Sequence, residues 1–153
     1  MQYYSTGNSA ERVASLPVPT RATAVHKRVV YQVDLADVGL AGLLAGELLQ
    51  ITAAIEATND LGYNVSFVTN LTLGTVSGVP GMEINEAAGE NITPDMHHGE
   101  RTLARQWKVP TNMPLHRYVQ LTCWAASSRG GSTARLAIMQ DYGHLDVVRW
   151  API

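Results

Sequence analysis

Hydrophobic and polar residues alternate with a period of two along most of the chain. In residues 28–35 (RVVYQVDL), Tyr31, Val33 and Leu35 share one face, and β-branched residues are frequent. This combination is typical of a half-buried β-strand. The same alternation recurs in residues 65–73, 101–109, 116–125, 134–140 and 145–150. It predicts a chain made mainly of short strands.

Residues 48–58 (LLQITAAIEAT) are the one segment where helix and strand compete, because Leu, Ala, Glu and Gln favour a helix. At helical spacing the polar residues scatter around the axis and leave no apolar stripe. At a period of two, Leu49, Ile51 and Ile55 fall on one face, opposite Gln50 and Thr52. The pattern therefore predicts a strand.

The segments between these runs are rich in turn residues. Residues 59–64 (NDLGYN) suit a turn, so we expect residues 48–58 and 65–73 to form a hairpin. A glycine-rich loop leads to a short strand near residues 82–84, and residues 86–98 show no period and are expected to be loop. About eight strands with no long helix indicate an all-β fold, an antiparallel β-sandwich of which the jelly roll is one form.

The first 27 residues show no sustained period. They contain Gly7, Pro17 and Pro19, and we expect an extended N-terminal arm outside the core, with the sandwich domain in residues 28–153. Two interpretations stay open: a disordered tail, or an arm that lies on a neighbouring subunit.

The amino-acid composition limits the classes of partner that we expect for this protein. The chain has 153 residues, 16% of them charged, a formal net charge of −2 and a pI near 6.2. No basic excess is available to neutralise phosphates, so we expect no nucleic-acid partner. No apolar run approaches the ~18 residues of a membrane span, and the N-terminus lacks the pattern of a signal peptide, so we expect no membrane role.

Candidate chemistry is sparse. Asp95, His97 and His98 could supply metal ligands, but adjacent residues on an extended chain point to opposite sides. No nucleophile-elbow motif occurs, and Cys123, the only cysteine, alternates with apolar residues and is expected to be buried and inert. We therefore expect no enzyme activity, no cofactor and no metal.

Aromatic residues in the predicted strands leave one question open. If Trp107, Tyr118 and Trp124 share an exposed face, they would form a sugar-stacking platform or a subunit contact. If they face inward, they belong to the core, which is the commoner arrangement. A carbohydrate-binding module on a β-sandwich is therefore the alternative function.

Three stretches carry a resemblance to a known class of proteins. They are residues 47–74, including QIT at 50–52 and TNDLGYNV at 58–65, residues 89–98 (GENITPDMHH) and residues 140–145 (QDYGHL). Together they resemble small β-sandwich structural proteins from the virions of tailed bacteriophages. The resemblance spans residues 28–150.

This resemblance implies a non-enzymatic virion component, such as a capsid decoration (cement) protein, located in a particle assembled in the host cytoplasm. It also implies contact with a major capsid or other virion protein, and a homo-oligomer, with a trimer favoured. Considering the arm and the exposed aromatics together, we expect partner contacts at Tyr3, Tyr4, Pro17, Pro19, Arg21, Tyr118 and Trp124.

Overall fold

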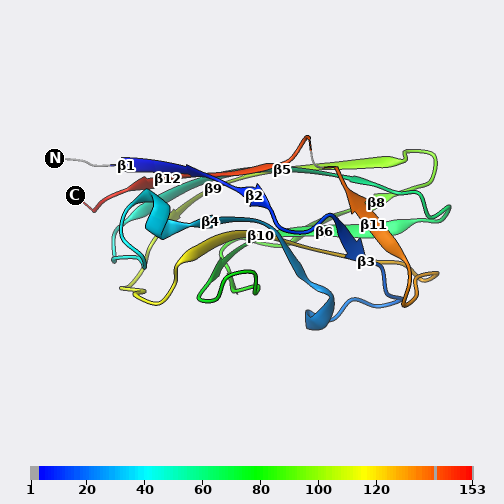
Figure 1. Ribbon diagram of the computed structural model, residues 1–153, viewed down its shortest axis with the longest axis horizontal. Coiled ribbons are helices and arrows are strands. Elements are labelled where there is room, and N and C mark those ends of the chain that lie inside the picture. Colours follow the sequence, from blue (N-terminus) through cyan, green and yellow to red (C-terminus); the bar gives the residue numbers. More distant parts are fainter. Residues whose placement is uncertain (1–3, 140, 153) are drawn as a thin grey trace.

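The computed structural model describes residues 4–139 and 141–152. Their strands form two antiparallel sheets that pack face to face, and the two ends of the chain lie at the same end of the molecule (Figure 1). The predicted fold class, an all-β sandwich, is confirmed. Two short 3₁₀ helices accompany the sheets: η1 (Ala24–His26) and η2 (Leu35–Val38).

The first sheet, sheet A, is built around β5. One edge of β5 pairs with β12 and, further along, with β11; the other edge pairs with β9. The outer strands β1 and β3 pair with β12 and β11. The strands of sheet A are β1 (Tyr4–Asn8), β3 (Ser15–Pro17), β5 (Leu48–Thr58), β9 (His98–Lys108), β11 (Arg135–Ile138) and β12 (His144–Trp150).

Sheet B is built around β10, which lies between β4 and β6. The short β2 extends the sheet beyond β4, and β7 and β8 both pair with the outer edge of β6. The strands of sheet B are β2 (Ala10–Glu11), β4 (Arg28–Asp34), β6 (Val65–Gly74), β7 (Met82–Glu83), β8 (Ala88–Ile92) and β10 (Tyr118–Ala126).

The longer strands follow the order of a jelly roll. Sheet A contains β1-β12-β5-β9 and sheet B contains β4-β10-β6-β8, so the chain passes repeatedly from one sheet to the other. Such crossings join residues distant in the sequence. They bring the loop before β5 next to the end of β12, where the candidate site lies.

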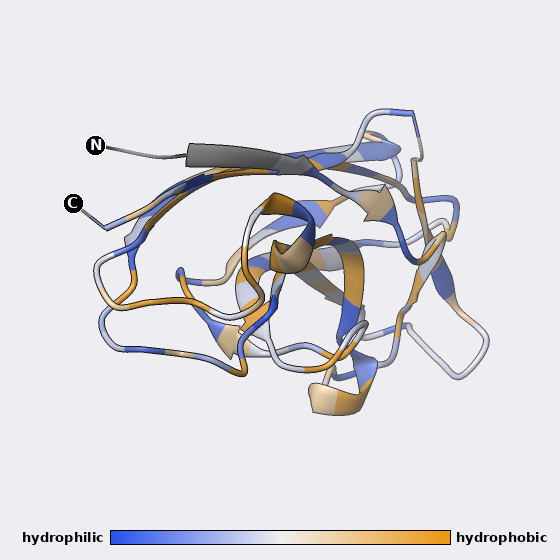
Figure 2. Ribbon diagram, turned by 60° about the vertical axis from the view of Figure 1, so that its left-hand side comes forward, coloured by the Kyte–Doolittle hydropathy of each residue, from blue (hydrophilic) through white to orange (hydrophobic). Residues whose placement is uncertain are grey.

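Burial in β5 confirms the predicted strand at residues 48–58. Leu49, Ile51 and Ile55 are at most 2% exposed, whereas Thr52 on the opposite face is exposed. Hydrophobic and hydrophilic segments alternate along the strands of both layers (Figure 2). One apolar core, built from the inward faces of both sheets, fills the space between them.

The predicted hairpin of residues 48–58 and 65–73 is wrong, although both strands exist. β5 belongs to sheet A and β6 to sheet B, so the turn between them crosses from one sheet to the other. Turn residues mark a reversal of the chain, and they do not specify which strands pair across it.

The described part of the expected N-terminal arm is extended, but it lies within the sandwich, which corrects the expectation of a segment outside the core. β1 pairs with β12, β2 with β4 and β3 with β11. Leu16 and Val18 are fully buried. These strands have only two to five residues, too few to show a period in the sequence.

The segment expected to be loop at residues 86–98 also contains a strand. β8 pairs with the outer edge of β6, with Ile92 opposite Val65. Only Ile92 of this strand is fully buried. A single apolar residue gives no periodicity, which is why the pattern did not reveal the strand.

Candidate functional site

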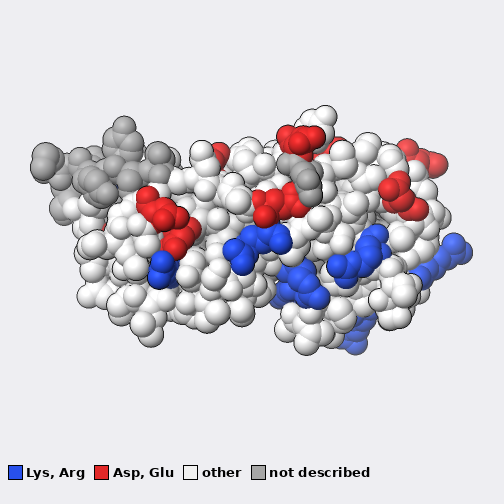
Figure 3. Space-filling model, in the orientation of Figure 1, with Lys and Arg blue, Asp and Glu red and all other residues white. Residues whose placement is uncertain are grey.

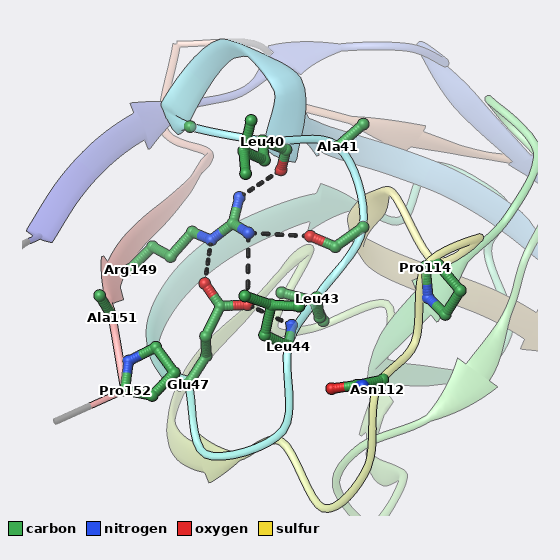
Figure 4. Close-up of a pocket in the computed structure, with 12 residues that line it drawn as sticks. Leu40, Ala41, Leu43, Leu44, Glu47, Asn112, Pro114, Arg149, Ala151 and Pro152 are labelled. Atoms are coloured by element: carbon green, nitrogen blue, oxygen red, sulfur yellow. Dashed lines mark hydrogen bonds and ion pairs between the residues drawn. The ribbon is translucent and has the colours of Figure 1, made fainter.

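An apolar cleft opens at the end of the sandwich where β5 begins and β12 ends (Figure 4). Its volume is about 630 Å³, within the range of small-molecule and side-chain pockets. Three segments form its walls: the loop between η2 and β5, the loop before β10, and the residues after β12. The lining residues are Gly39, Leu40, Ala41, Gly42, Leu43, Leu44, Glu47, Asn112, Pro114, Arg149, Ala151 and Pro152.

Arg149 organises the wall of the cleft. It is 4% exposed, and its Nε donates to Glu47 Oε1 at 2.8 Å. One terminal nitrogen donates to the carbonyls of Leu35 and Leu40 at 3.3 and 2.6 Å, and the other to the carbonyl of Gly42 and to Glu47 Oε2 at 2.8 and 3.3 Å. These five bonds use all five N–H groups of the guanidinium. Arg149 therefore supports the loop and has no donor left for a ligand.

Glu47 completes this buried ion pair. It is 5% exposed, and its Oε2 also accepts the backbone N–H of Leu44 at 2.6 Å. A buried charge is tolerated only when it is paired and hydrogen-bonded, and both conditions hold for this pair. The loop from residue 40 to 47 is consequently tied to β12 at several points.

The opposite wall is joined to this loop through the backbone. Leu43 and Met113 exchange backbone hydrogen bonds of 2.8 and 3.0 Å, and the Ala45 N–H donates to Asn112 Oδ1. Gly42 has a φ of 80°, and a Cβ there would lie 2.5 Å from the Pro114 carbonyl oxygen. Glycine is required both for the left-handed backbone and for this close approach.

The rim of the cleft is hydrophobic and exposed. Leu40 and Leu44, which line the cleft, are 75% and 52% exposed. The buried polar groups of the wall already bond to each other, so an occupant would meet mainly hydrocarbon. The site therefore suits an uncharged apolar group.

The predicted contact residues of the N-terminal segment fall in different places. Tyr3 lies outside the described residues, and Tyr4 pairs with Trp150 at the start of β1. Pro17 and Pro19 are half-buried and line a shallow depression of about 240 Å³ away from the cleft. Arg21 is exposed. Their role in partner contact stays a prediction.

Tyr118 and Trp124 share the outer face of sheet B, whereas Trp107 lies on sheet A and packs partly against the core. The three do not form one platform. The Lys27 ammonium lies 4.4 Å from the centre of the Trp124 ring, and the Arg117 guanidinium 5.5 Å from that of Tyr118. Each cation lies over one face of its ring, where it would compete with a stacking sugar.

The two adjacent histidines lie closer together than expected. The rings of His97 and His98 pack edge to face with centroids 4.5 Å apart, and His97, directly after the turn at residues 94–96, has a positive φ of 64°. Their Nδ1 atoms approach different carboxylates, Asp60 at 3.4 Å and Glu56 at 3.5 Å. Within residues 4–139 and 141–152, no three His, Cys, Asp or Glu side chains group as a metal site.

Cys123 is fully buried, as expected, and burial raises the pKa of its thiol well above the ordinary value. A thiol in this state is a poor nucleophile. No helix in the described part of the chain is long and apolar enough to cross a membrane. Charges of both signs are scattered over the face seen in Figure 3, with wide uncharged areas between them.

The alternation of residues along the chain does not reveal the cleft. One signal was present: Arg149 alternates with Leu145 and Val147 on the inward face of β12. An arginine at a core-facing position requires a buried acceptor. The identity of that acceptor, Glu47, could not be read from the sequence because 102 residues separate the two.

The strand order and the two packed sheets define the protein as an antiparallel jelly-roll sandwich. The sequence matches no known protein-family model, and no curated protein matches it. Solved structures do share the fold. A chain in the structure of infectious bursal disease virus strain Gx superposes over 97% of this chain with a TM-score of 0.58 and 11% identity.

Two further structures are similar. The chain in the VP2 subviral particle of infectious bursal disease virus gives a TM-score of 0.51 with 9% identity over 99% of this chain, and latent PorU from Porphyromonas gingivalis gives 0.51 with 13% identity over 99%. The chain spans 35% and 38% of the two virus chains and 13% of PorU. At these identities the likeness establishes a shared fold.

Proposed function

We propose that this protein is a non-enzymatic structural component of a virus particle, a decoration or cement subunit of a phage capsid that acts by contact with neighbouring subunits. The observation that carries the proposal is the shared fold: nearly the whole chain superposes on a domain of a virus structure and of a VP2 subviral particle. PorU shares the sandwich as well, so a direct test is needed.

The surface of the protein supports a role in contact. Only 16% of the residues are charged, and the cleft presents two leucines, Leu40 and Leu44, to solvent at one end of the sandwich. Exposed apolar patches beside a preformed cavity are typical of binding surfaces. In this proposal an apolar side chain of a neighbouring virion protein fills the cleft, and three subunits meet around a symmetry axis on the particle.

The first experiment is to count this chain in particles purified from its source, by quantitative mass spectrometry against the major shell protein. We expect about one copy, or about one third of a copy, per shell subunit, because decoration proteins occupy symmetry-related positions. Absence of the chain from particles would overturn the proposal. A few copies per particle would replace the decoration role with a minor structural one.

A second experiment tests the cleft. The double variant Leu40→Ser, Leu44→Ser removes two exposed side chains that line the cleft, 75% and 52% exposed, and Val25→Ser is the matched control, since Val25 is 74% exposed on η1. We expect the double variant to bind particles from which this chain has been removed at least about tenfold more weakly, because the loss of apolar anchor residues weakens an interface by this order. The control variant should bind normally. Equal binding by all three proteins would exclude the cleft as the contact.

A further inference from the structure

We propose that β9 pairs with β9 of a second copy of this chain, joining two sandwiches through a continuous sheet. This association goes beyond the proposed particle role and does not rest on it. The strand has 11 residues and pairs on one side only, with β5, among the described residues. On its other edge, residues 99–108 form no backbone hydrogen bond to a described residue, and such an unpaired edge is the template for strand addition.

The two faces of β9 differ in the side chains that a second strand would meet. Leu103 and Trp107 pack against the core, and the alternation of the strand puts Arg101 and Arg105 on the same side. Arg101 is half-buried, whereas Arg105 is exposed and its Nε donates to the Ile84 carbonyl at 3.1 Å. The outer face is exposed and carries His98, Glu100, Thr102, Ala104, Gln106 and Lys108. Charged residues on an edge strand usually prevent random pairing, so the arrangement of these charges decides which pairing is permitted.

Two antiparallel copies related by a two-fold axis can meet in only a few registers. If the two-fold axis passes beside Leu103, this residue lies opposite its own copy, and Arg101 lies opposite Arg105 of the second copy at two symmetric positions. An axis at Arg105 places this arginine opposite itself. Like charges directly opposite each other destabilise a strand pair, and both registers are therefore unfavourable.

An axis at Ala104 removes these conflicts. It places Glu100 opposite Lys108 of the second copy and Thr102 opposite Gln106, each twice by symmetry. On the inner face, Arg101 then lies opposite Trp107 of the second copy, where a cation–π contact can form. The neighbouring register, with its axis at Thr102, places Glu100 opposite Ala104 and offers no charge pair. Charge complementarity therefore selects the register centred on Ala104.

The test is charge reversal measured by sedimentation equilibrium over a range of protein concentrations. The unmodified protein should show a concentration-dependent monomer–dimer equilibrium. Glu100→Lys converts two attractive pairs into repulsive ones, and we expect the dimer Kd to rise about tenfold or more. Glu100 already lies opposite Glu56 of β5, so this change removes a like-charge pair inside the monomer and leaves the fold intact.

The double variant Glu100→Lys, Lys108→Glu restores both pairs with reversed sign and should recover the original Kd. Asp141→Lys is the matched control, because it makes the same change in charge at an exposed loop residue outside β9. Hydrogen exchange adds a second readout: amides of residues 100–108 should become protected as protein concentration rises.

Three outcomes would overturn the proposal. They are a monomer at every concentration, a closed trimer in which β9 amides exchange freely, and an association that Glu100→Lys leaves unchanged. Each is distinguishable from failure of the particle role, which is measured by counting copies in particles and does not involve β9.

Discussion

The two ends of β5 are held by buried polar residues of opposite character. Before the strand, Glu47 forms a charged pair with Arg149, and that pair binds three backbone carbonyls. After the strand, the neutral Asn59, 2% exposed, donates to the carbonyls of Tyr63 and Ile92 at 2.8 and 2.9 Å and accepts the Leu61 N–H.

The surfaces above these two centres also differ. The end with the ion pair has the apolar cleft and its exposed leucines. Beyond Asn59 lies a polar depression of about 340 Å³, lined by Gly62, Tyr63, Asn64, Pro94, Ser127, Ser128 and Arg129. An amide suffices to hold a polar turn. At the cleft, a fully bonded guanidinium ties down a longer loop that exposes hydrocarbon, which suits a surface for contact.

Replacement of Arg149 should have the largest effect on the protein. Arg149→Ala leaves Glu47 as an unpaired buried charge and three carbonyls without a donor, so we expect a loss of about 3–5 kcal/mol in the free energy of unfolding. Urea denaturation measures it. Arg129→Ala, at an exposed arginine of the polar end, is the control and should change stability by less than about 0.5 kcal/mol. Similar losses in the two variants would show that the ion pair does not hold the loop.

Replacement of Asn59 should cost less, because no charge is left unpaired. Asn59→Ala removes two hydrogen bonds to backbone carbonyls and one from the Leu61 N–H. We expect a loss of about 2 kcal/mol. The same urea experiment measures the change. A loss equal to that of Arg149→Ala would contradict the proposed difference between the two ends.

Two glycines with nearly the same backbone conformation allow a direct comparison of the two ends of β5. Gly42 at the cleft has a φ of 80° and Gly62 at the polar end a φ of 78°. A Cβ at Gly42 would meet the Pro114 carbonyl, whereas one at Gly62 would meet nothing within 4 Å. Both alanine variants should lose about 1 kcal/mol from backbone strain, and Gly42→Ala should lose roughly 1–2 kcal/mol more from the clash. Equal thermal stabilities would show that the cleft loop adapts freely.

The smallest expected effect concerns the pH dependence of stability that the ion pair between Asp34 and Arg117 produces. The Arg117 side chain bonds both carboxylate oxygens of Asp34 at 2.8 Å, and these bonds lower the pKa of Asp34. A lowered pKa stabilises the folded state above the ordinary value of about 3.9, and this contribution is lost as the pH falls through the folded-state pKa. Asp34→Asn should therefore reduce stability at pH 7 and reduce its decline below about pH 4. Parallel pH profiles of the two proteins would contradict this.

The strands that could be predicted from the sequence are those long enough to show a period. β4, β5, β6 and β10 have seven to eleven residues and one face built of Val, Leu, Ile and other apolar side chains. Cys123 was correctly placed in the core by the same alternation. In each case the signal is local, because the alternation of side chains across a strand depends on the backbone alone.

The pairing of the strands could not be predicted from this alternation. β5 and β6 follow each other across a turn of standard composition, yet they belong to different sheets. β1 is a strand of sheet A because β12, more than 130 residues later, provides its partner. Which strands pair depends on how all the apolar faces are buried together, and the sequence of a short segment does not determine this.

The amino-acid sequence by itself determined the all-β class, the inward faces of the longer strands and the weakly charged surface, since these follow from local alternation and composition. Only the tertiary structure decided the cleft and the free edge of β9. The cleft exists because Arg149 meets a carboxylate 102 residues away, and the edge exists because β9, within residues 4–139 and 141–152, pairs on one side only, with β5. Both result from contacts between distant segments, which form only when the two sheets close over a common core.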